Sequence, residues 1–204
     1  MKRLTIVVGT LFLLSVLSAC SSGPQVQRVG AGEQVDLSGF WNAADVRIVS
    51  RSLINDALSS PRVDQAIAGL GRTPMVIVGR FRNASSEHID TAIISNTMEQ
   101  EIFNSGRMDF VAGGIAREEL RAERLAQMED GFVSDETMAG LGHEIGADFM
   151  LTGSVRTIVD RAGNRTARTY FVTAELTCIR TNQRMWIAEN SEITKVVVQP
   201  RRRI

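Results

Sequence analysis

The most constraining pattern in the sequence is an alternation of apolar and polar residues over positions 169–179. The positions on one face of this stretch are Tyr170, Val172, Ala174, Leu176 and Cys178, and those on the other are mostly threonine and glutamate. Successive side chains of a β-strand point to opposite faces of a sheet, so such a strand has one buried and one solvated face. The chain is therefore expected to contain a half-buried β-strand.

Two further strand-like stretches flank this one. Residues 148–160 precede it and residues 185–197 follow it, the latter as a single final strand that includes Trp186. The connections are short and polar, over residues 162–164 and 180–183. Short polar connections between strands are typical of antiparallel neighbours, so the last third of the chain is predicted to form an antiparallel meander.

The first half of the chain has the three- and four-residue spacing of helices. Val46, Val49, Leu53 and Ala57 form one apolar stripe over residues 43–58, and Asn42 precedes it as a capping residue. Further helices are predicted over residues 60–70, 90–105, 115–128 and 134–146, and strands over residues 75–79 and 109–112. Strand 75–79 is uninterrupted by polar residues and is expected to be buried on both faces. The order of elements predicts an α+β domain, with helices packed on a mixed β-sheet that ends in the meander.

Three of the predicted helices carry specific expectations about their faces. The helix over 90–105 should bury Ile93, Ile102 and Phe103 together with Ile89. The helix over 115–128 is mostly charged and should lie exposed. The helix over 134–146 should begin at Ser134, end at Gly146 and turn its apolar residues inward, namely Met138, Leu141 and Ile145.

The first 19 residues have the order of a secretory signal. Lys2 and Arg3 precede a short apolar run from Leu4 to Leu17, which is too short to span a bilayer comfortably. The Leu-Ser-Ala-Cys stretch ending at Cys20 resembles the lipobox of bacterial lipoproteins. This resemblance implies that Cys20 becomes the mature N-terminus and carries a diglyceride and an acyl chain such as palmitate. Several acyl chains anchor a protein stably where one chain does not.

The resemblance to lipoproteins also suggests a location. Ser21 stands where an aspartate would indicate retention in the inner membrane, so an outer-membrane anchor with the domain facing the periplasm is expected. Residues 20–39 read as the lipidated N-terminus and a linker, residues 40–199 as one globular domain, and residues 200–204 as a basic tail.

Charge and cysteine content exclude several function classes. Removal of Lys2 and Arg3 with the signal leaves 21 basic against 23 acidic residues, a net charge of about −2 that does not indicate nucleic-acid binding. The tail cluster Arg201, Arg202 and Arg203 is read as solvated charge. Once Cys20 is acylated, Cys178 has no partner for a disulfide, and it is read as a small core residue. With only His88 and His143 beside it, the chain offers no convincing metal site.

Sequence motifs of catalysis are also missing. His143 and Glu144 begin a zincin-like pattern, but Ala147 stands where its second histidine is needed. A Ser–His–carboxylate arrangement of Ser85, His88 and Glu87 would place sequence neighbours on one loop, which rarely converge on a substrate. We therefore expect no enzyme activity, no cofactor and no small-molecule substrate.

One stretch of the sequence closely resembles a known family, the LpoB-type activators of penicillin-binding proteins. Its most specific part is the Asn-x-Ser-Ser-Glu-His-Ile-Asp loop over residues 83–90. The similarity covers nearly the whole domain in the expected order, with matching segments at residues 36–42, 59–62, 76–91, 104–106, 110–111, 117–119, 123–125, 134–137, 141–142, 146–153 and 181–183, and at Trp186. The Gly-Ala-Asp element at 146–148 recurs in TolB-like and CsgG-like lipoprotein domains.

This resemblance implies an outer-membrane lipoprotein with a TolB N-terminal-like or CsgG-like domain. Such a protein docks on a bifunctional penicillin-binding protein and stimulates peptidoglycan synthesis, and with it cell wall biogenesis and cell shape, without catalysing either reaction. Better-known members have a longer, proline-rich tether, so the short linker here leaves open how the domain reaches a synthase rooted in the inner membrane.

Two surfaces are candidates for docking. The first is the loop that contains Asn83, Ser85, Ser86, Glu87, His88 and Asp90. In an alternative interpretation, Ser85 and Ser86 cap the following helix while Glu87 and His88 hold the turn. The second is the charged helix that carries Arg117, Glu119, Arg121 and Arg124, which is otherwise read as a solvated face.

A structural envelope lipoprotein, or a CsgG-like component of a secretion assembly, is the alternative function. A pore would need an additional pair of amphipathic strands, and the strands of the meander are already needed for the domain's own sheet.

Overall fold

The computed structural model of the 204-residue chain describes residues 27–30, 33, 35–129, 134 and 144–200. The chain divides into two compact units, residues 1–33 and residues 34–204, and every described helix and strand lies in the second unit. Among the described residues, no helix is long and apolar enough to cross a membrane.

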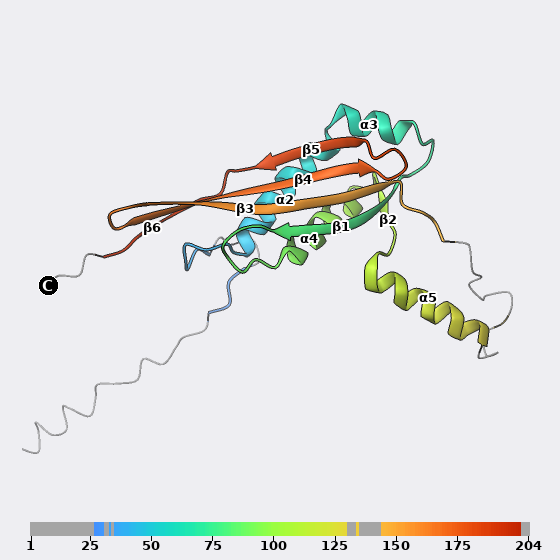
Figure 1. The fold of residues 1–204 in the computed structure, drawn as a ribbon, viewed down its shortest axis with the longest axis horizontal. Helices are drawn as coiled ribbons and strands as arrows, with labels where there is room; N and C mark the ends of the chain where they lie inside the picture. Colours follow the sequence, from blue (N-terminus) through green and yellow to red (C-terminus); the bar gives the residue numbers. More distant parts are fainter. Residues whose placement is uncertain (1–26, 31–32, 34, 130–133, 135–143, 201–204) are drawn as a thin grey trace, which may run out of the picture. The chain divides into compact units, whose positions relative to one another are not determined.

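A mixed β-sheet forms one layer of the second unit (Figure 1). Its strands lie in the order β2-β1-β3-β4-β5, and β6 pairs with the other end of β4. β1 is parallel to β2 and β3, whereas β3, β4 and β5 form an antiparallel meander, as the sequence predicted. The strands are β1 (Met75–Asn83), β2 (Asp109–Phe110), β3 (Phe149–Ala162), β4 (Arg165–Cys178), β5 (Arg184–Asn190) and β6 (Thr194–Val198).

Helices pack on one face of this sheet, which makes the fold α+β. α2 and α4 contact each other, α2 also contacts β5, and α4 contacts β1 (Figure 1). The described helices are α2 (Ala43–Leu58), α3 (Pro61–Ala68), α4 (Thr91–Asn104) and α5 (Gly114–Glu129).

The predicted stripe of α2 is the centre of the core. Val46, Val49, Leu53 and Ala57 are all at most 6% exposed. Asn42 accepts hydrogen bonds from the first turn and Asp45 accepts one in return, which completes a capping box. Burial of an aliphatic side chain contributes about 1.5–3 kcal/mol, so this stripe fastens α2 to the sheet.

The alternation in β4 is also confirmed. Tyr170, Val172, Ala174 and Leu176 are at most 3% exposed and face the helices, whereas Cys178 is half-buried where the strand ends. β4 pairs with β3 along its whole length, from Arg165 opposite Ala162 to Cys178 opposite Phe149. The meander therefore supplies a continuous apolar face for α2 and α4.

Two predicted faces are wrong. β1 is not buried on both sides, because Ile77 and Val78 are only half-buried. In α4, Ile93 and Phe103 are 55% and 60% exposed, while Ile94, Met98 and Ile102 face the core. Ile93 and Ile94 are neighbours, so the apolar pattern alone did not decide which of them faces the sheet.

The predicted final strand is two strands. β5 ends at Asn190, whose side chain is buried and binds Ser52, and whose Oδ1 accepts the N–H of Glu192. The chain turns at this point, and β6 then pairs with residues 165–169 of β4 rather than extending β5.

The predicted helix over 134–146 lies mostly outside the described residues, Met138 and Leu141 included. Residues 144–146 are described and are not helical, and Ile145 is 59% exposed rather than turned inward.

Candidate docking surface

The loop over residues 83–90 connects β1 to α4 and is organised by Asn83. The Asn83 side-chain NH₂ donates to the carbonyl oxygens of Glu87 and Ile89, at 2.8 and 3.3 Å. Its Oδ1 accepts from both the N–H and the hydroxyl of Ser85, at 3.0 and 2.7 Å. One asparagine thus replaces the backbone hydrogen bonds that an irregular loop lacks, and it gives the loop a defined shape.

Glu87 connects this loop to the sheet. Its carboxylate accepts the hydroxyl proton of Tyr170, with both oxygens 2.9 Å from that hydroxyl, and forms an ion pair with Arg168 at 3.4 Å. It also accepts the backbone N–H of Trp41 at 3.3 Å. The side chains of Glu87 and Arg168 are 9% and 15% exposed, so this contact is largely shielded from water.

The pKa of Tyr170, the tyrosine that Glu87 binds, reflects these shielded surroundings. Burial raises the pKa of the Tyr170 hydroxyl well above its usual value, and the hydrogen bond to Glu87 raises it further. Tyr170 therefore stays protonated and remains a donor to Glu87 throughout the physiological range.

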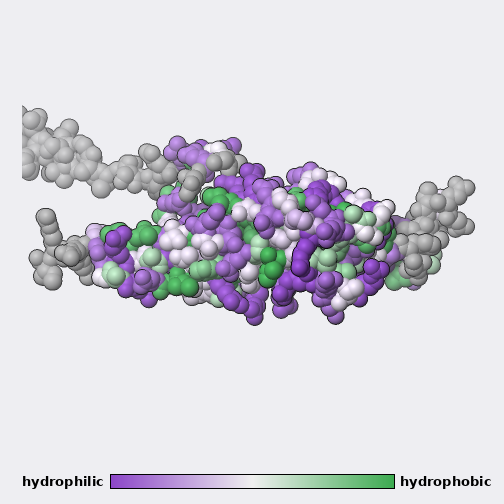
Figure 2. Space-filling model, turned by 90° about the horizontal axis from the view of Figure 1, so that it is seen from above, coloured by the Kyte–Doolittle hydropathy of each residue, from purple (hydrophilic) through white to green (hydrophobic). Residues whose placement is uncertain are grey.

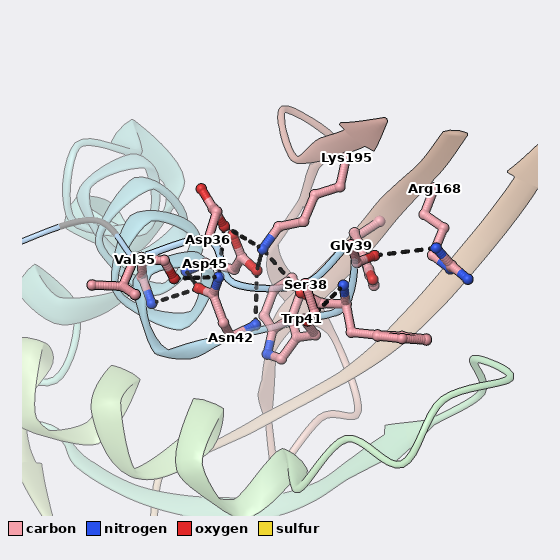
Figure 3. A network of polar contacts seen from close by, with 12 residues as sticks. Val35, Asp36, Ser38, Gly39, Trp41, Asn42, Asp45, Arg168 and Lys195 are labelled. Carbon is pink, nitrogen blue, oxygen red and sulfur yellow. Dashed lines mark hydrogen bonds and ion pairs between the residues drawn. The ribbon is translucent and has the colours of Figure 1, made fainter. Parts of the chain in front are cut away.

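A segment that we call the strap, residues 35–42, crosses β4 and β6 before α2 begins (Figure 3). A Cβ on Gly39 would collide with the side chain of Val197, so glycine is needed for this close approach. Next to it, the Arg168 guanidinium lies 4.5 Å from the centroid of the Phe40 ring, and one of its N–H groups donates to the Gly39 carbonyl. Arg168 thus contacts both the strap and Glu87 of the loop.

The second fastening of the strap is Lys195 of β6 (Figure 3). Its ammonium lies 2.6 Å from Asp45 and 2.9 Å from Asp36, and it donates to the Phe40 carbonyl at 3.0 Å. The Lys195 and Asp45 side chains are 11% and 3% exposed. Burial lowers the pKa of Lys195, but the two carboxylates more than offset this and the net shift of the pKa is upward. Residues 36–39, which the sequence placed in the linker, therefore contact the domain.

The loop and the strap together present a mixed surface to solvent. The exposed polar side chains of the loop are Asn83, Ser86, His88 and Asp90, and Ser85 and Glu87 are half-buried. On the strap, Leu37 is 93% exposed and Phe40 is 49% exposed. Aromatic and arginine side chains flanked by polar groups are the usual composition of an interaction hot spot. We refer to the loop together with Leu37 and Phe40 as the loop–strap surface.

The serines of the loop do not cap α4. The capping residue is Asp90, whose side chain accepts the N–H of Ala92 at 3.0 Å. Ser85 bonds within the loop, to Asn83 and Glu87. Glu87 does hold the turn, although by a long-range contact with Tyr170 that a local pattern does not reveal.

The second predicted surface, α5, is mostly exposed, as expected, and buries no residue. Arg117 donates to the Ala112 carbonyl, whereas Arg121 and Arg124 both bind Glu144, at 2.9 and 2.7 Å. The hydrogen bond from Arg121 is the main cause that lowers the pKa of Glu144 to about 2. Between α5 and β2 lies an open cleft of about 340 Å³, lined in part by Arg117, Leu120 and Ile145.

Other candidate residues have structural surroundings. Trp186 is 6% exposed and donates to Asp56 at 2.7 Å, which makes it a core anchor. Within the described ranges, no group of three His, Cys, Asp or Glu side chains could hold a metal ion. Cys20 lies outside the described residues. The described candidates thus fall into two separate surfaces, the loop–strap surface and the arginine face of α5.

Comparison with known proteins relates most of the domain to one family. The family model described as "Peptidoglycan-synthase activator LpoB" matches residues 45–192. The matched range includes the loop over 83–90, α5 and the whole meander up to Glu192. The chain matches no curated protein sequence.

Solved structures similar to the chain are distant in sequence. The C-terminal domain of LpoB from Escherichia coli is 15% identical, with a TM-score of 0.43, and the match covers 76% of this chain and 99% of that chain. The same domain from Salmonella enterica is 16% identical, with a TM-score of 0.41 and the same coverage. Lipoprotein GNA1162 from Neisseria meningitidis is 14% identical, with a TM-score of 0.36, over 60% of this chain and 83% of that chain.

Proposed function

The chain belongs to the family of the peptidoglycan-synthase activator LpoB, and on this premise we propose that it activates a bifunctional penicillin-binding protein by docking on it. The observation that carries the proposal is the family match over residues 45–192, which includes the loop over residues 83–90 and α5, whereas Leu37 and Phe40 of the strap lie just before it. The protein contributes binding and no chemistry of its own. Glycan polymerisation and peptide cross-linking take place on the synthase.

Docking activates an enzyme only through a difference in binding free energy. The domain must bind the active conformation of the synthase more tightly than the resting conformation, and a tenfold difference corresponds to about 1.4 kcal/mol. A rigid docking surface suits this role, because little free energy is then lost in ordering it on binding. The buried contacts of Glu87 and Lys195 give the loop–strap surface that rigidity.

The proposed docking site is the loop–strap surface, with Phe40 and Leu37 as apolar anchors and Ser86, His88, Asn83 and Asp90 as polar contacts. The arginine face of α5 is the second candidate, through Arg117, Arg121 and Arg124. Its arginines already bind Glu144 and a backbone carbonyl, so a partner would have to replace these contacts.

The location follows from the N-terminal sequence. Cys20 is proposed to carry the lipid, Ser21 favours the outer membrane, and the domain then faces the periplasm. This arrangement supports a role in cell wall biogenesis. An envelope scaffold would share the lipid anchor and the location, so the two functions differ only in what the domain does to a synthase.

The decisive experiment measures glycan synthesis. Residues 21–204 contain every described helix and strand, and they are added to purified bifunctional synthases of the same organism in detergent with lipid II. Faster polymerisation and direct binding with one synthase are expected. If no synthase is bound or accelerated, the activator function is wrong and the scaffold function takes its place.

Substitutions then locate the docking site. Phe40→Ala and His88→Ala should weaken binding to the synthase about tenfold, because hot-spot side chains contribute more than about 1 kcal/mol each. Phe103→Ala on α4 is the matched control, since Phe103 is a phenylalanine outside the loop–strap surface that is at least as exposed as Phe40. An effect of Arg121→Glu alone, without an effect of Phe40→Ala or His88→Ala, would assign docking to α5.

A further inference from the structure

The face of the sheet that points away from α2 and α4, which we call the outer face, carries a row of four polar side chains. Arg82 of β1 lies opposite Ser154 of β3. Thr173 of β4 lies opposite Ser154 on one side and opposite Glu189 of β5 on the other. Residues that lie opposite one another share a face of a sheet, and Thr173 points away from the helices because its neighbour Val172 faces them. The row therefore crosses the outer face with a cation at one end and an anion at the other.

The charges at the two ends of this row have no partner among the described residues. Arg82 and Glu189 are exposed, and neither side chain has an ion pair or a hydrogen bond within the ranges that the structure describes. Between them, the hydroxyl oxygens of Ser154 and Thr173 lie 3.1 Å apart and hydrogen-bond to each other. Three strand spacings of about 4.8 Å place the ends of the row about 14 Å apart, which is beyond the screening length in physiological salt. Within the described chain, both charges are therefore available to a partner.

The order of the charges in this row matches a second copy of the same chain. A two-fold axis that runs parallel to the strands, between β3 and β4, places two such faces against each other and reverses the order of the row. Arg82 of each copy then lies against Glu189 of the other copy, and Ser154 lies against Thr173. A partner of a single charge would match only one end of the row, whereas a second copy matches both ends.

The neighbouring row of the outer face repeats this match. Arg156 of β3 lies opposite Phe171 of β4, and the same axis places Arg156 of each copy against Phe171 of the other copy. Arg156 is exposed, with no side-chain partner in the described part of the chain, and a guanidinium over an aromatic ring is an attractive contact. Ile158 and Ile187, also on the outer face, are 62% and 52% exposed, and their burial between two copies adds an apolar contribution.

The size of the outer face also suits an interface between two copies. β3 and β4 are each 14 residues long, so the face extends about 46 Å along them and about 14 Å across four strands. A standard interface between proteins buries about 800 Å² of accessible surface on each partner, which a face of these dimensions can supply. Figure 2 shows apolar residues interspersed with hydrophilic ones along the molecule. An interface of such mixed composition depends on matched charges for its selectivity.

From these observations we propose that two copies of the chain pair through their outer faces, about a two-fold axis parallel to β3 and β4, with Arg82 of each copy bound to Glu189 of the other. Two sheets packed face to face in this way keep their strands within about 30° of each other. The loop–strap surface lies on the other side of the sheet, because Glu87 binds Tyr170 and Tyr170 faces the helices. Each copy therefore keeps its proposed docking surface, and the pairing goes beyond activation of a synthase and does not rest on it.

Sedimentation equilibrium tests the proposal. The dimer fraction of residues 21–204 should rise with protein concentration through the micromolar range and fall at high salt, which screens the charge pairs. Arg82→Glu and Glu189→Arg each place like charges against each other at two contacts, and each should weaken dimerisation at least about tenfold. An equimolar mixture of the two variants should form a heterodimer as stable as the unmutated dimer within about threefold, because opposite charges then meet at both contacts.

The matched controls are Arg51→Glu and Glu101→Arg, which make the same changes of charge on α2 and α4, on the opposite side of the sheet. Each should change dimerisation less than about twofold, and their mixture should dimerise no better than the unmutated chain. Circular dichroism establishes that all four variants are folded, as expected for substitutions at exposed positions.

A chain that stays monomeric at every concentration would overturn the proposal. So would single reversals at Arg82 and Glu189 that leave the dimer as stable as before, or a mixture of them that does not restore it. Loss of synthase binding in Arg82→Glu, together with an unmutated chain that does not dimerise, would assign the outer face to the synthase instead. The sedimentation experiment contains no synthase, so failure of the dimer leaves the proposed function standing, and failure of activation leaves the dimer standing.

Discussion

The loop–strap surface and α5 are rich in the same charged residues but use them differently. Around the strap, Lys195, Asp45, Glu87 and Arg168 lie with at most 15% of each side chain exposed and connect segments distant in the sequence. Arg121 of α5 and its partner Glu144, which lies after the helix, are 54% and 31% exposed, and α5 itself has no buried residue. The charged residues around the strap hold separate segments together and so determine the shape of a surface. Those of α5 lie on the surface without determining its shape.

This difference concerns how much each charge depends on its partner. A buried charge that loses its partner cannot be hydrated by water instead, so removal of the partner is costly. An exposed charge is hydrated again at once, and its pair contributes about 0–1 kcal/mol. Substitutions at the two regions should therefore differ several-fold in their effect on stability.

The largest expected effect is that of Lys195→Ala. It leaves Asp45 buried without its cation, and the free energy of unfolding should fall by about 3 kcal/mol. Urea denaturation followed by circular dichroism measures this value. Arg51→Ala is the control, because the Arg51–Glu101 pair is exposed and should contribute less than about 0.5 kcal/mol. Equal losses in the two variants would show that the strap contact is as weak as a surface pair.

Glu87→Gln should have the next largest effect. Glutamine keeps the size of the side chain but removes the charge that Arg168 and Tyr170 face, so a loss of about 2 kcal/mol is expected. The Tyr170 pKa should move down toward its ordinary value, which a spectrophotometric titration of the single tyrosine detects. An unchanged titration would show that Glu87 adds nothing to the increase in the Tyr170 pKa that burial causes.

Phe40→Leu tests the smaller part of the strap contact. It removes the aromatic face below Arg168 while it keeps an apolar side chain, and a cation–π contact at a partly exposed site contributes about 0.5–1 kcal/mol. The same denaturation assay applies. A loss above about 2 kcal/mol would place Phe40 among the residues that hold the domain together, not among those free to contact a partner.

The smallest effect is expected on α5. Arg121→Gln should leave stability essentially unchanged, since the pair is exposed and screened by water. The Glu144 pKa should nevertheless rise from about 2 toward its ordinary value, because Arg121 is the main cause of the shift. A lowered pKa means that the contact is fully present above about pH 4.5 and is lost as the pH falls through about 2. Carboxyl NMR titration of both proteins checks the shift.

The sequence predicted the elements that local patterns determine. The stripe of α2 and the alternation of β4 each place one face against a single partner layer, and both faces were assigned correctly. In α4 the choice between Ile93 and Ile94 depends on the angle at which the helix meets the sheet, which the apolar pattern does not contain. The break at Asn190 depends on Ser52, 138 residues away.

The candidate site was predicted only in part for the same reason. The loop over 83–90 was recognised from its motif, but the role of Glu87 depends on Tyr170, 83 residues later, and on Arg168. Phe40 was placed at the start of the domain without a role. The position of Phe40 depends on its neighbour Gly39. The close approach of Gly39 to Val197 exists only when β6 is paired with β4, so the sequence alone does not show it.

The fastening of the strap to β6 also bears on how the chain folds. Lys195 and Asp36 are 159 positions apart, so this contact closes nearly the whole domain into one loop. The β3–β4 hairpin is local and can form early, whereas contacts between distant positions are slow because the loop they close carries an entropic cost. The strap should therefore be among the last parts to reach its native place. In a chain synthesised from its N-terminus, the loop–strap surface therefore stays incomplete until β6 has been made and has paired with β4.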